Sequence, residues 1–434
     1  MKLRKLSSVM LSTALLFASA TAAATEPELA PLPAPPAAAW YELVELSAFV
    51  DGYASINYNF PKPNEGANRA RAFDRDTGFA LGWAGVDASF PAEPVGGTLS
   101  LRFGPNAKRY NDDEVEGLEQ VTQAFASFRP GGPKDPLRLD FGKFDSIYGV
   151  ESAESHLNHH YSPGLVFTYV TPASHMGARL AWDLGDALTL NALVVNGWDR
   201  SLDTNTGKTF GAQLVVRPSQ RFDVSLGWLG GPEQPDTLEV SCPDGTSYQV
   251  DAAGCAASPG ASAASYTVDR GGANELGAWR HLFDAMISWR PTDSWDLYGS
   301  FNYRTEGVRQ DTRTSDTESL KHLAGALGAR YALSAAWAVA ARGEYLRVTG
   351  EEADGQPALS ADHFPLGVPD LSLASATLTL ELRPTDHLIL RLENRADFAL
   401  DAHSSASTSV FAKGVRDASD SQITTTLGVV VTTH

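Results

Sequence analysis

The sequence predicts an all-β protein: a transmembrane antiparallel up-and-down β-barrel of about sixteen strands, with 14–18 as the range. Two observations predict it. Many segments of about ten residues alternate apolar and polar side chains, and this is the length that a tilted membrane-spanning strand needs. Short turns and long polar stretches also alternate along the chain, which is typical of barrels with short periplasmic turns and long extracellular loops.

The alternation is clearest near the C-terminus. Leu388, Leu390 and Leu392 point to one face of a strand, while Arg391 and Glu393 point to the other. A strand with one apolar and one charged face is half-buried. The same pattern also fits a soluble sandwich or a lipocalin-like barrel, and the order of the connections decides between these folds. We therefore expect the apolar face to meet lipid and the charged face to line a lumen.

Counting the segments between connectors gives sixteen predicted strands. They are residues 45–60, 78–90, 97–104, 119–129, 137–144, 175–183, 187–198, 208–217, 221–230, 278–290, 295–306, 320–333, 337–348, 371–383, 387–399 and 421–432. Lipid offers no hydrogen-bond partner to the backbone, so a sheet crosses it only when it closes on itself. A barrel of this width leaves an open lumen.

Residues 1–24 have the basic start, short apolar core and small-residue end of a signal peptide. An N-terminal anchor is the alternative. Residues 25–39 form a Pro/Ala-rich periplasmic leader, and residues 40–434 form the predicted barrel. No later segment approaches the length of an apolar membrane helix. We therefore expect an exported protein of the outer membrane whose partners include outer-membrane lipid.

Charge and cysteine content narrow the choice further. The net charge of −18 argues against nucleic acid as a partner, because phosphate binding needs a basic surface. Cys242 and Cys255 lie in one polar stretch and are predicted to form a disulfide, as exported proteins favour. Two unpaired thiols are the alternative. A homotrimer is compatible with sixteen strands, and no sequence feature decides it.

The polar faces of the strands predict the wall of the lumen. Arginine at mid-depth would cost about 2–4 kcal/mol if it faced lipid, and water in a lumen removes that cost. Most of these residues are expected to pair with one another, and a few to bias which ions enter. The predicted wall residues are Arg102, Arg138, Asp140, Arg179, Arg304, Arg342, Glu344, Arg391, Glu393 and Arg395.

The stretch 145–174 differs from the other long connections. It holds apolar Leu165, Val166 and Phe167, which are unusual in a solvent-exposed loop. We expect it to fold inward and narrow the pore, with an acidic loop facing an arginine-rich wall. The predicted constriction residues are Asp145, Glu151, Glu154, His156, His159, His160 and Tyr161.

The three histidines of this stretch, with Glu154, are of the types that bind transition metals. Their spacing matches no metal motif, so no metal and no other cofactor is predicted. Histidine protonation is expected to change conductance near pH 6, close to its reference pKa. No catalytic motif is present, and His281, Asp284 and Ser288 do not fall on one face of their strand, so an enzyme is not predicted.

Several motifs resemble the putative β-barrel porin-2 family. They are D-G-Y-A-S-I-N-Y-N-F (51–60), L-R-L-D-F-G-K-F-D-S-I-Y-G-V-E (137–151), N-H-H-Y-S-P-G-L-V-F-T-Y-V-T-P-A-S-H-M-G-A-R-L (158–180), V-V-N-G-W-D (194–199), G-K-T-F-G-A-Q-L (207–214) and G-W-L-G-G-P-E (227–233). The resemblance covers about a fifth of the chain and implies an outer-membrane barrel with a pore function. It transfers no binding residues. The chain ends in Thr433 and His434 rather than in the aromatic residue of many such barrels.

The sequence thus predicts a porin for passive diffusion of small hydrophilic solutes or ions. The alternative is a closed or plugged barrel with a structural or adhesive role, favoured by the long polar stretch 231–277. Conductance separates the two hypotheses.

Overall fold

The computed structural model describes most of the chain from Trp40 onward. Within residues 40–433 it leaves out 63–65, 112–113, 115–116, 243–245, 249–254, 258–263, 270–277, 310–316, 351, 354–355, 358–364, 368–369, 401–409 and 416. The predicted signal peptide and leader, residues 1–39, lie outside the described residues and remain predictions. Tyr41–His434 forms one compact unit.

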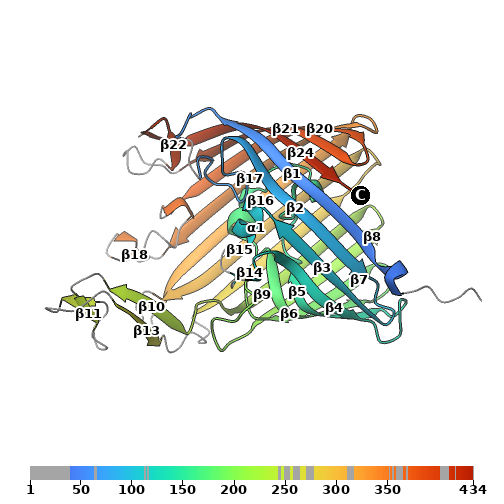
Figure 1. Cartoon of the computed structure of the whole chain (residues 1–434), viewed down its shortest axis with the longest axis horizontal. Coiled ribbons are helices and arrows are strands. Elements are labelled where there is room, and N and C mark those ends of the chain that lie inside the picture. The colour runs from blue at the N-terminus through green and yellow to red at the C-terminus, as the bar shows by residue number, and fades with distance from the viewer. Residues whose placement is uncertain are drawn as a thin grey trace, which may run out of the picture. The chain divides into compact units, whose positions relative to one another are not determined.

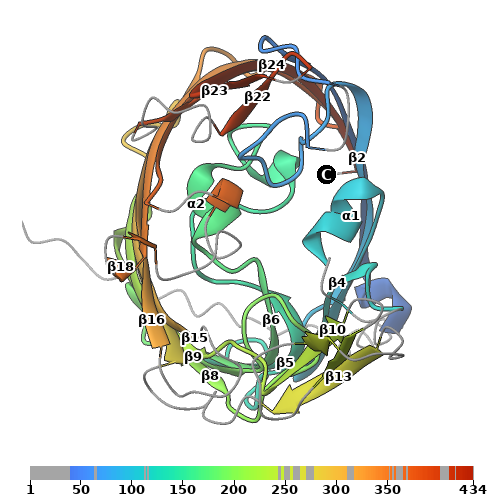
Figure 2. The same cartoon turned by 90° about the vertical axis from the view of Figure 1, so that its left-hand side faces the viewer.

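Sixteen antiparallel strands of the described chain close into one barrel, and the predicted fold class is confirmed (Figures 1 and 2). Each of the sixteen strands pairs with the next of the sixteen along the chain. The last pairs with the first, from Phe49 opposite Thr432 to Asn57 opposite Thr424. The strands are β1 (Glu45–Asn57), β2 (Gly78–Phe90), β3 (Val95–Phe103), β4 (Val121–Phe128), β5 (Leu137–Asp145), β6 (Ser174–Asp183), β7 (Leu188–Val195), β8 (Thr209–Ser219), β9 (Phe222–Pro232), β14 (Trp279–Trp289), β15 (Trp295–Arg309), β16 (Thr317–Ala332), β17 (Trp337–Gly350), β20 (Ser372–Thr385), β21 (Leu388–Ala399) and β24 (Ser421–Thr432).

The two faces of the wall have opposite chemistry. On the inner face Arg391 and Arg395 are each 1% exposed, whereas Leu392 between them is 44% exposed on the outer face. Leu327 and Leu378 are likewise exposed on the outside. This arrangement inverts that of a soluble protein, because lipid solvates the apolar face and the lumen receives the charges.

Connections alternate between the two ends of the barrel as the sequence predicts. The short turns are residues 91–94, 129–136, 184–187, 220–221, 290–294, 333–336 and 386–387. The long connections are residues 58–77, 104–120, 146–173, 196–208, 233–278, 310–316, 351–371 and 400–420. The largest difference from prediction lies at 307–319, where β15 and β16 continue to Arg309 and from Thr317.

Short elements within the connections were not predicted from the alternating pattern. The helices are η1 (Trp40–Leu43), α1 (Pro105–Tyr110), η2 (Ser155–Leu157), α2 (Leu165–Tyr169) and η5 (Pro365–Gly367). The additional strands are β10 (Thr237–Cys242), β11 (Thr246–Tyr248), β12 (Cys255–Ala257), β13 (Ala264–Asp269), β18 (Glu352–Ala353), β19 (Gln356–Pro357), β22 (Phe411–Lys413) and β23 (Asp417–Ser419). None of the helices in the described part is long and apolar enough to span a bilayer.

The cysteines lie in two of these additional strands. Cys242 ends β10 and Cys255 begins β12. Their side chains lie outside the described part of the structure, so the disulfide remains a prediction.

Candidate functional site

The connection 146–173 runs through the interior of the barrel (Figure 2). It leaves from β5 and returns to β6, which are the fifth and sixth strands of the barrel. It bonds to β17, β20 and β21, which are the thirteenth to fifteenth strands in barrel order. Because these two groups of strands lie half a circumference apart, the segment reaches the opposite wall. We call residues 146–173 the internal loop.

The apolar residues of the internal loop have a direct structural role. Helix α2 begins at Leu165, and Leu165 and Val166 are almost completely buried. They belong to one apolar cluster with Leu346 of β17 and Leu373 of β20. The wall is therefore locally apolar on its inner face, where α2 packs against it.

Two charged residues of β17 hold the middle of the internal loop. Arg342 forms an ion pair with Glu151 and donates a hydrogen bond to the carbonyl of Ser162 at 3.0 Å. Glu151 also accepts the backbone N–H of Gly164 at 2.7 Å. Glu344 accepts the N–H of Val166 at 3.4 Å. Backbone groups and side chains of the loop are thus satisfied by the wall.

Strand β21 continues this contact with alternating charges. Arg391 donates hydrogen bonds to the carbonyls of Ser155, Asn158 and His160, the last two at 2.6 and 3.1 Å. Glu393 accepts the N–H of Tyr161 at 2.7 Å, and Arg395 donates to the carbonyl of Pro163 at 2.7 Å. The loop backbone from Ser155 to Pro163 follows the inner face of this strand.

Asp51 of β1 is a further anchor that sequence analysis did not identify. Its carboxylate accepts hydrogen bonds from the Tyr161 hydroxyl at 2.6 Å and the Ser155 hydroxyl at 2.5 Å. Burial, and then the nearby Asp51 charge, raise the pKa of Tyr161 well above its usual value. The Tyr161 hydroxyl therefore remains a donor. The sequence feature that could have identified this anchor is an aspartate within a strand of alternating apolar and polar residues.

The three histidines point in different directions. The centroid of the His156 ring lies 4.4 Å from that of the Phe49 ring. The Nε2 atom of His159 lies 3.3 Å from the Asp296 carboxylate. The Nδ1 atom of His160 lies 2.8 Å from the Thr379 hydroxyl. Among the described residues no group of three or more His, Cys, Asp or Glu is arranged to hold a metal. The geometry gives the histidines no shared ligand site.

Burial also changes the titration of two histidines. Burial and then the charge of Arg102 lower the pKa of His156 to about 4. Burial and then Arg342 lower the pKa of His160 well below its usual value. Both rings are therefore neutral at pH 6, and neither one provides the conductance change expected there from the sequence.

The remaining predicted wall residues also lie on the inner face and are paired. Arg102 binds Glu154 at 2.5 Å and Asp87 at 2.8 Å. Burial, which outweighs the Arg102 charge, raises the pKa of Glu154 to about 7. The other wall contacts are Arg138–Asp140 at 3.2 Å, Arg179–Asp140 at 2.8 Å and Arg304–Glu306 at 3.1 Å. Arg138, Arg179 and Arg304 thus pair with other wall residues, which is the arrangement expected for most of the wall, whereas Arg102 contacts Glu154 of the acidic loop directly.

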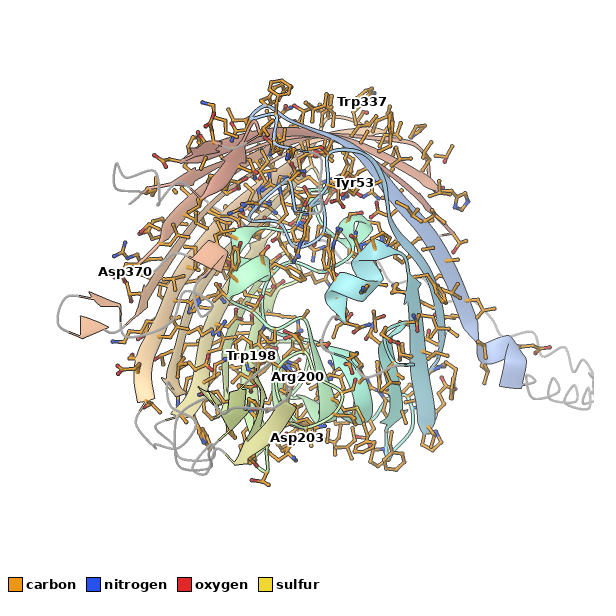
Figure 3. The ribbon with its side chains drawn as sticks, turned by 60° about the vertical axis from the view of Figure 1, so that its left-hand side comes forward. Tyr53, Trp198, Arg200, Asp203, Trp337 and Asp370 are labelled. Carbon is orange, nitrogen blue, oxygen red and sulfur yellow. The ribbon has the colours of Figure 1, made fainter. Side chains whose placement is uncertain are left out.

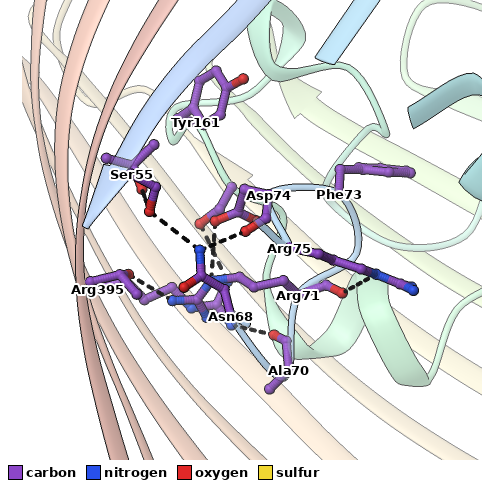
Figure 4. A network of polar contacts seen from close by, with 12 residues as sticks. Ser55, Asn68, Ala70, Arg71, Phe73, Asp74, Arg75, Tyr161 and Arg395 are labelled. Carbon is purple, nitrogen blue, oxygen red and sulfur yellow. Dashed lines mark hydrogen bonds and ion pairs between the residues drawn. The ribbon is translucent and has the colours of Figure 1, made fainter. Parts of the chain in front are cut away.

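A second connection, 58–77, also enters the barrel, which sequence analysis missed (Figure 4). Arg71 lies 3.1 Å from Asp74 and 2.6 Å from Asp397 of β21, and it is buried. Arg395 donates to the carbonyl of Ala70 at 3.2 Å. The dense charges of residues 69–76, with Phe73 among them, were the signal for a segment that pairs with a charged wall.

Trp198, from the connection 196–208, is a third inward contact, and it lies beside the wall in Figure 3. Its ring is covered by the guanidinium groups of Arg280 at 4.9 Å and Arg304 at 5.2 Å. Arg280 in turn binds Glu306 at 2.7 Å. This cluster fixes the connection against β14 and β15 through cation–π contacts and ion pairs.

Two cavities follow the internal loop. The first, about 280 Å³, is lined by Thr122 and Asp145, which lie where β4 begins and β5 ends, at the end of the barrel with the long connections. The second, about 300 Å³, is lined by Asp223 and Asp296, near the short-turn end. Val150 and Glu151 line both cavities. The two spaces therefore adjoin the same point of the internal loop from opposite ends of the barrel.

A closed sixteen-stranded barrel with an apolar outer face and a charged interior defines the class: this is a porin-like outer-membrane β-barrel. The family follows from the sequence as a whole. The model of the family "Putative beta-barrel porin-2, OmpL-like" matches residues 43–432, and the chain belongs to this family.

Solved structures show the same fold. The trimer form of OmpT from Vibrio cholerae matches with a TM-score of 0.53 and 11% identity, covering 90% of this chain and 98% of that chain. OmpF from Salmonella typhi, in complex with daunomycin, matches with a TM-score of 0.50 and 12% identity, covering 90% and 97%. At such identities the likeness concerns the fold alone. No curated protein sequence matches the chain significantly.

Proposed function

We propose that this protein is an outer-membrane porin that lets small hydrophilic solutes or ions diffuse passively through a water-filled lumen, without chemical turnover. The internal loop would narrow this lumen. The observation that carries the proposal is the pair of cavities that adjoin Val150 and Glu151 from opposite ends of the barrel. Solutes would pass beside the loop, through the two cavities that its residues 149–159 border.

The charged inner face supports the proposal on physical grounds. A lumen without water would leave its paired charges in a low dielectric, where desolvation is costly. Water beside the loop solvates the groups that no partner covers, such as Asp223. The strand number agrees, because sixteen strands enclose more space than side chains of the wall alone can fill.

The test is single-channel recording of the refolded protein in a planar bilayer. We expect stepwise currents, and larger steps when residues 151–161 are replaced by a short Gly-Ser linker. Folding of each variant is checked by its heat-dependent mobility on a gel. A matched control removes residues 402–408, between β21 and β24, and should change the step size less. Folded protein that inserts without current would contradict the proposal.

A plugged barrel with a structural or adhesive role is the second candidate. The observation that favours it is the number of inward connections, since 58–77, 146–173 and 196–208 all bond to the wall. This candidate requires insertion without conductance in the same recording. Loss of the internal loop would then create a current where the intact protein has none.

We further propose export by the predicted signal peptide, residues 1–24, and assembly as a homotrimer. The solved OmpT structure of similar fold is described as a trimer form. Sedimentation of the detergent-solubilised protein, with correction for bound detergent, distinguishes a trimer from a monomer. The mass of the mature N-terminus from outer-membrane preparations tests cleavage near Ala24.

A further inference from the structure

The charges that line the two cavities have one sign. Asp145, Glu151 and Glu154 line the first cavity. Glu151, Asp223 and Asp296 line the second, together with His159. No arginine or lysine of the described chain is among the residues that line either cavity. The space beside the internal loop is therefore bordered by carboxylates.

The arginines of the opposite wall are turned away from this space. Arg342, Arg391 and Arg395 are each at most 3% exposed and bond to the face of the internal loop that lies against the wall. Each also has a carboxylate partner, which is Glu151, Glu381 and Asp397 respectively. These ion pairs neutralise the arginines and their partners, Glu151 included, so the net negative charge of the lining comes from carboxylates without an arginine or lysine partner, such as Asp223.

Positive charge occurs nearer the end with the long connections. A third cavity, of about 230 Å³, shares Tyr110 with the first and is lined by Arg75, Arg109 and Asp199. Arg109 pairs with Asp76 at 2.8 Å. This region therefore carries both signs, whereas the lining of the first two cavities has carboxylates and no arginine or lysine.

Asp223 is the clearest of the lining carboxylates. It lies at the start of β9, on the inner face, and is partly exposed. Among the described residues no side chain bonds to its carboxylate, unlike Glu154, which pairs with Arg102. An ionised carboxylate without a protein partner is solvated by water and by mobile cations. Asp223 belongs to strand β9 of the wall, so its place in the cavity lining is fixed by the strand rather than by the internal loop.

We infer that the passage beside the internal loop prefers cations, both small inorganic ions and hydrophilic organic amines, over anions of similar size. This inference rests on the proposed pore function. Carboxylates around a confined volume of water raise the local concentration of cations and lower that of anions. The effect is strongest where neighbouring charges lie within about one screening length, which is about 10 Å in 0.1 M salt. The strongly negative net charge of the chain, −18, acts in the same direction.

The test measures the reversal potential of the full-length protein in a planar bilayer under a KCl gradient at pH 8. We expect a potential displaced toward the equilibrium potential of K⁺. The double substitution Asp223→Asn and Asp296→Asn keeps side-chain volume and removes two charges. It should lower the K⁺/Cl⁻ permeability ratio about twofold or more in 0.1 M salt, and less in 1 M salt, because of screening.

The matched control is Asp186→Asn, in the exposed turn between β6 and β7 and away from both cavities. It should leave the permeability ratio within about a tenth of the original, since exposed charges beyond the screening length act weakly. Open channels that prefer Cl⁻, or an unchanged ratio in the double variant, would overturn the inference while leaving the pore intact. Insertion without any current would overturn the proposed pore and the inference with it.

Discussion

Arg391 illustrates how one wall side chain fixes a loop that starts on the other side of the barrel. Its guanidinium group binds Glu381 at 2.8 Å and donates to three loop carbonyls. A guanidinium group presents five N–H donors in a fixed plane, so it can serve an acid and several carbonyls at once. A lysine ammonium group at this position would carry the same charge without that geometry.

Arg391→Lys therefore tests geometry separately from charge. We expect the internal loop to become mobile, which would appear as added noise and substates in the single-channel current. Loss of hydrogen bonds from a charged donor should lower the free energy of unfolding by about 1.5–3 kcal/mol in urea titrations. The control is Arg383→Lys, because Arg383 bonds to the same Glu381 from the exposed rim of the barrel. Equal, quiet currents from both variants would contradict this role of Arg391.

Glu154 gives the site its expected pH dependence. Burial raises its pKa to about 7, so the carboxyl group is mostly neutral at pH 6 and mostly ionised at pH 8. Lower pH thus removes a negative charge from the first cavity, and we expect the K⁺/Cl⁻ permeability ratio to fall with a midpoint near pH 7. Glu154→Gln should abolish this step. His156→Gln should leave it in place, because His156 is already neutral above about pH 5.

At the scale of the strand, the wall has lipid on its outer face and the lumen on its inner face, and this decides which residues are apolar and which are charged. Leu226 of β9 faces outward and is 54% exposed, while Asp223 of the same strand faces a cavity. Successive side chains of a strand point to opposite faces, so a shift of one residue would place every charge in lipid. The alternation therefore fixes the register as well as the face.

Arginine substitutions on β9 test this assignment. We expect Leu226→Arg to lower the free energy of unfolding in lipid vesicles by about 2–4 kcal/mol, the cost of arginine on the lipid face. Asp223→Arg should change it by less than about 1 kcal/mol, because the lumen solvates the new charge. Similar losses for both variants would show that the inner face is not wet at Asp223.

The strands were predictable from the sequence because their signal is local. Sixteen alternating segments were identified within a few residues of their ends, and the charged positions of β21 fell on the inner face. The long connections were recognised by length and composition. Their partners were not, since Arg391 and Ser155 are 236 residues apart and meet only once the barrel closes.

The interior segment 66–76 was missed for a related reason. Its charges resemble those of a solvated loop until the wall is in place, and only then does Arg71 find Asp397. The same limit affected the expected electrostatics. The sequence identified Arg342 and Glu151 as an opposing wall and loop, but their direct contact depends on how far the loop reaches.

At the scale of the whole molecule, the internal loop crosses the barrel interior and leaves cavities beside it. Strands β17, β20 and β21 are covered by the internal loop, which satisfies their charges. Strands β9, β14 and β15 also contact the internal loop, for example through the Gly149 N–H that donates to Asp284 at 3.3 Å, and they line the second cavity beside it. In the proposed pore, solutes would follow the cavities beside the loop, so the charge of the cavity lining, rather than that of the whole wall, would set the ion preference.

The most direct test of this account is chemical modification of the point that both cavities share. Val150→Cys is prepared in a Cys242→Ser, Cys255→Ser background and recorded in a planar bilayer. A positively charged thiol reagent, added to either chamber, should react with the new cysteine and lower the single-channel current irreversibly. The parent without the new cysteine should be unaffected. Complete labelling, verified by mass, with an unchanged current would mean that ions take another path, and it would contradict a passage beside the internal loop.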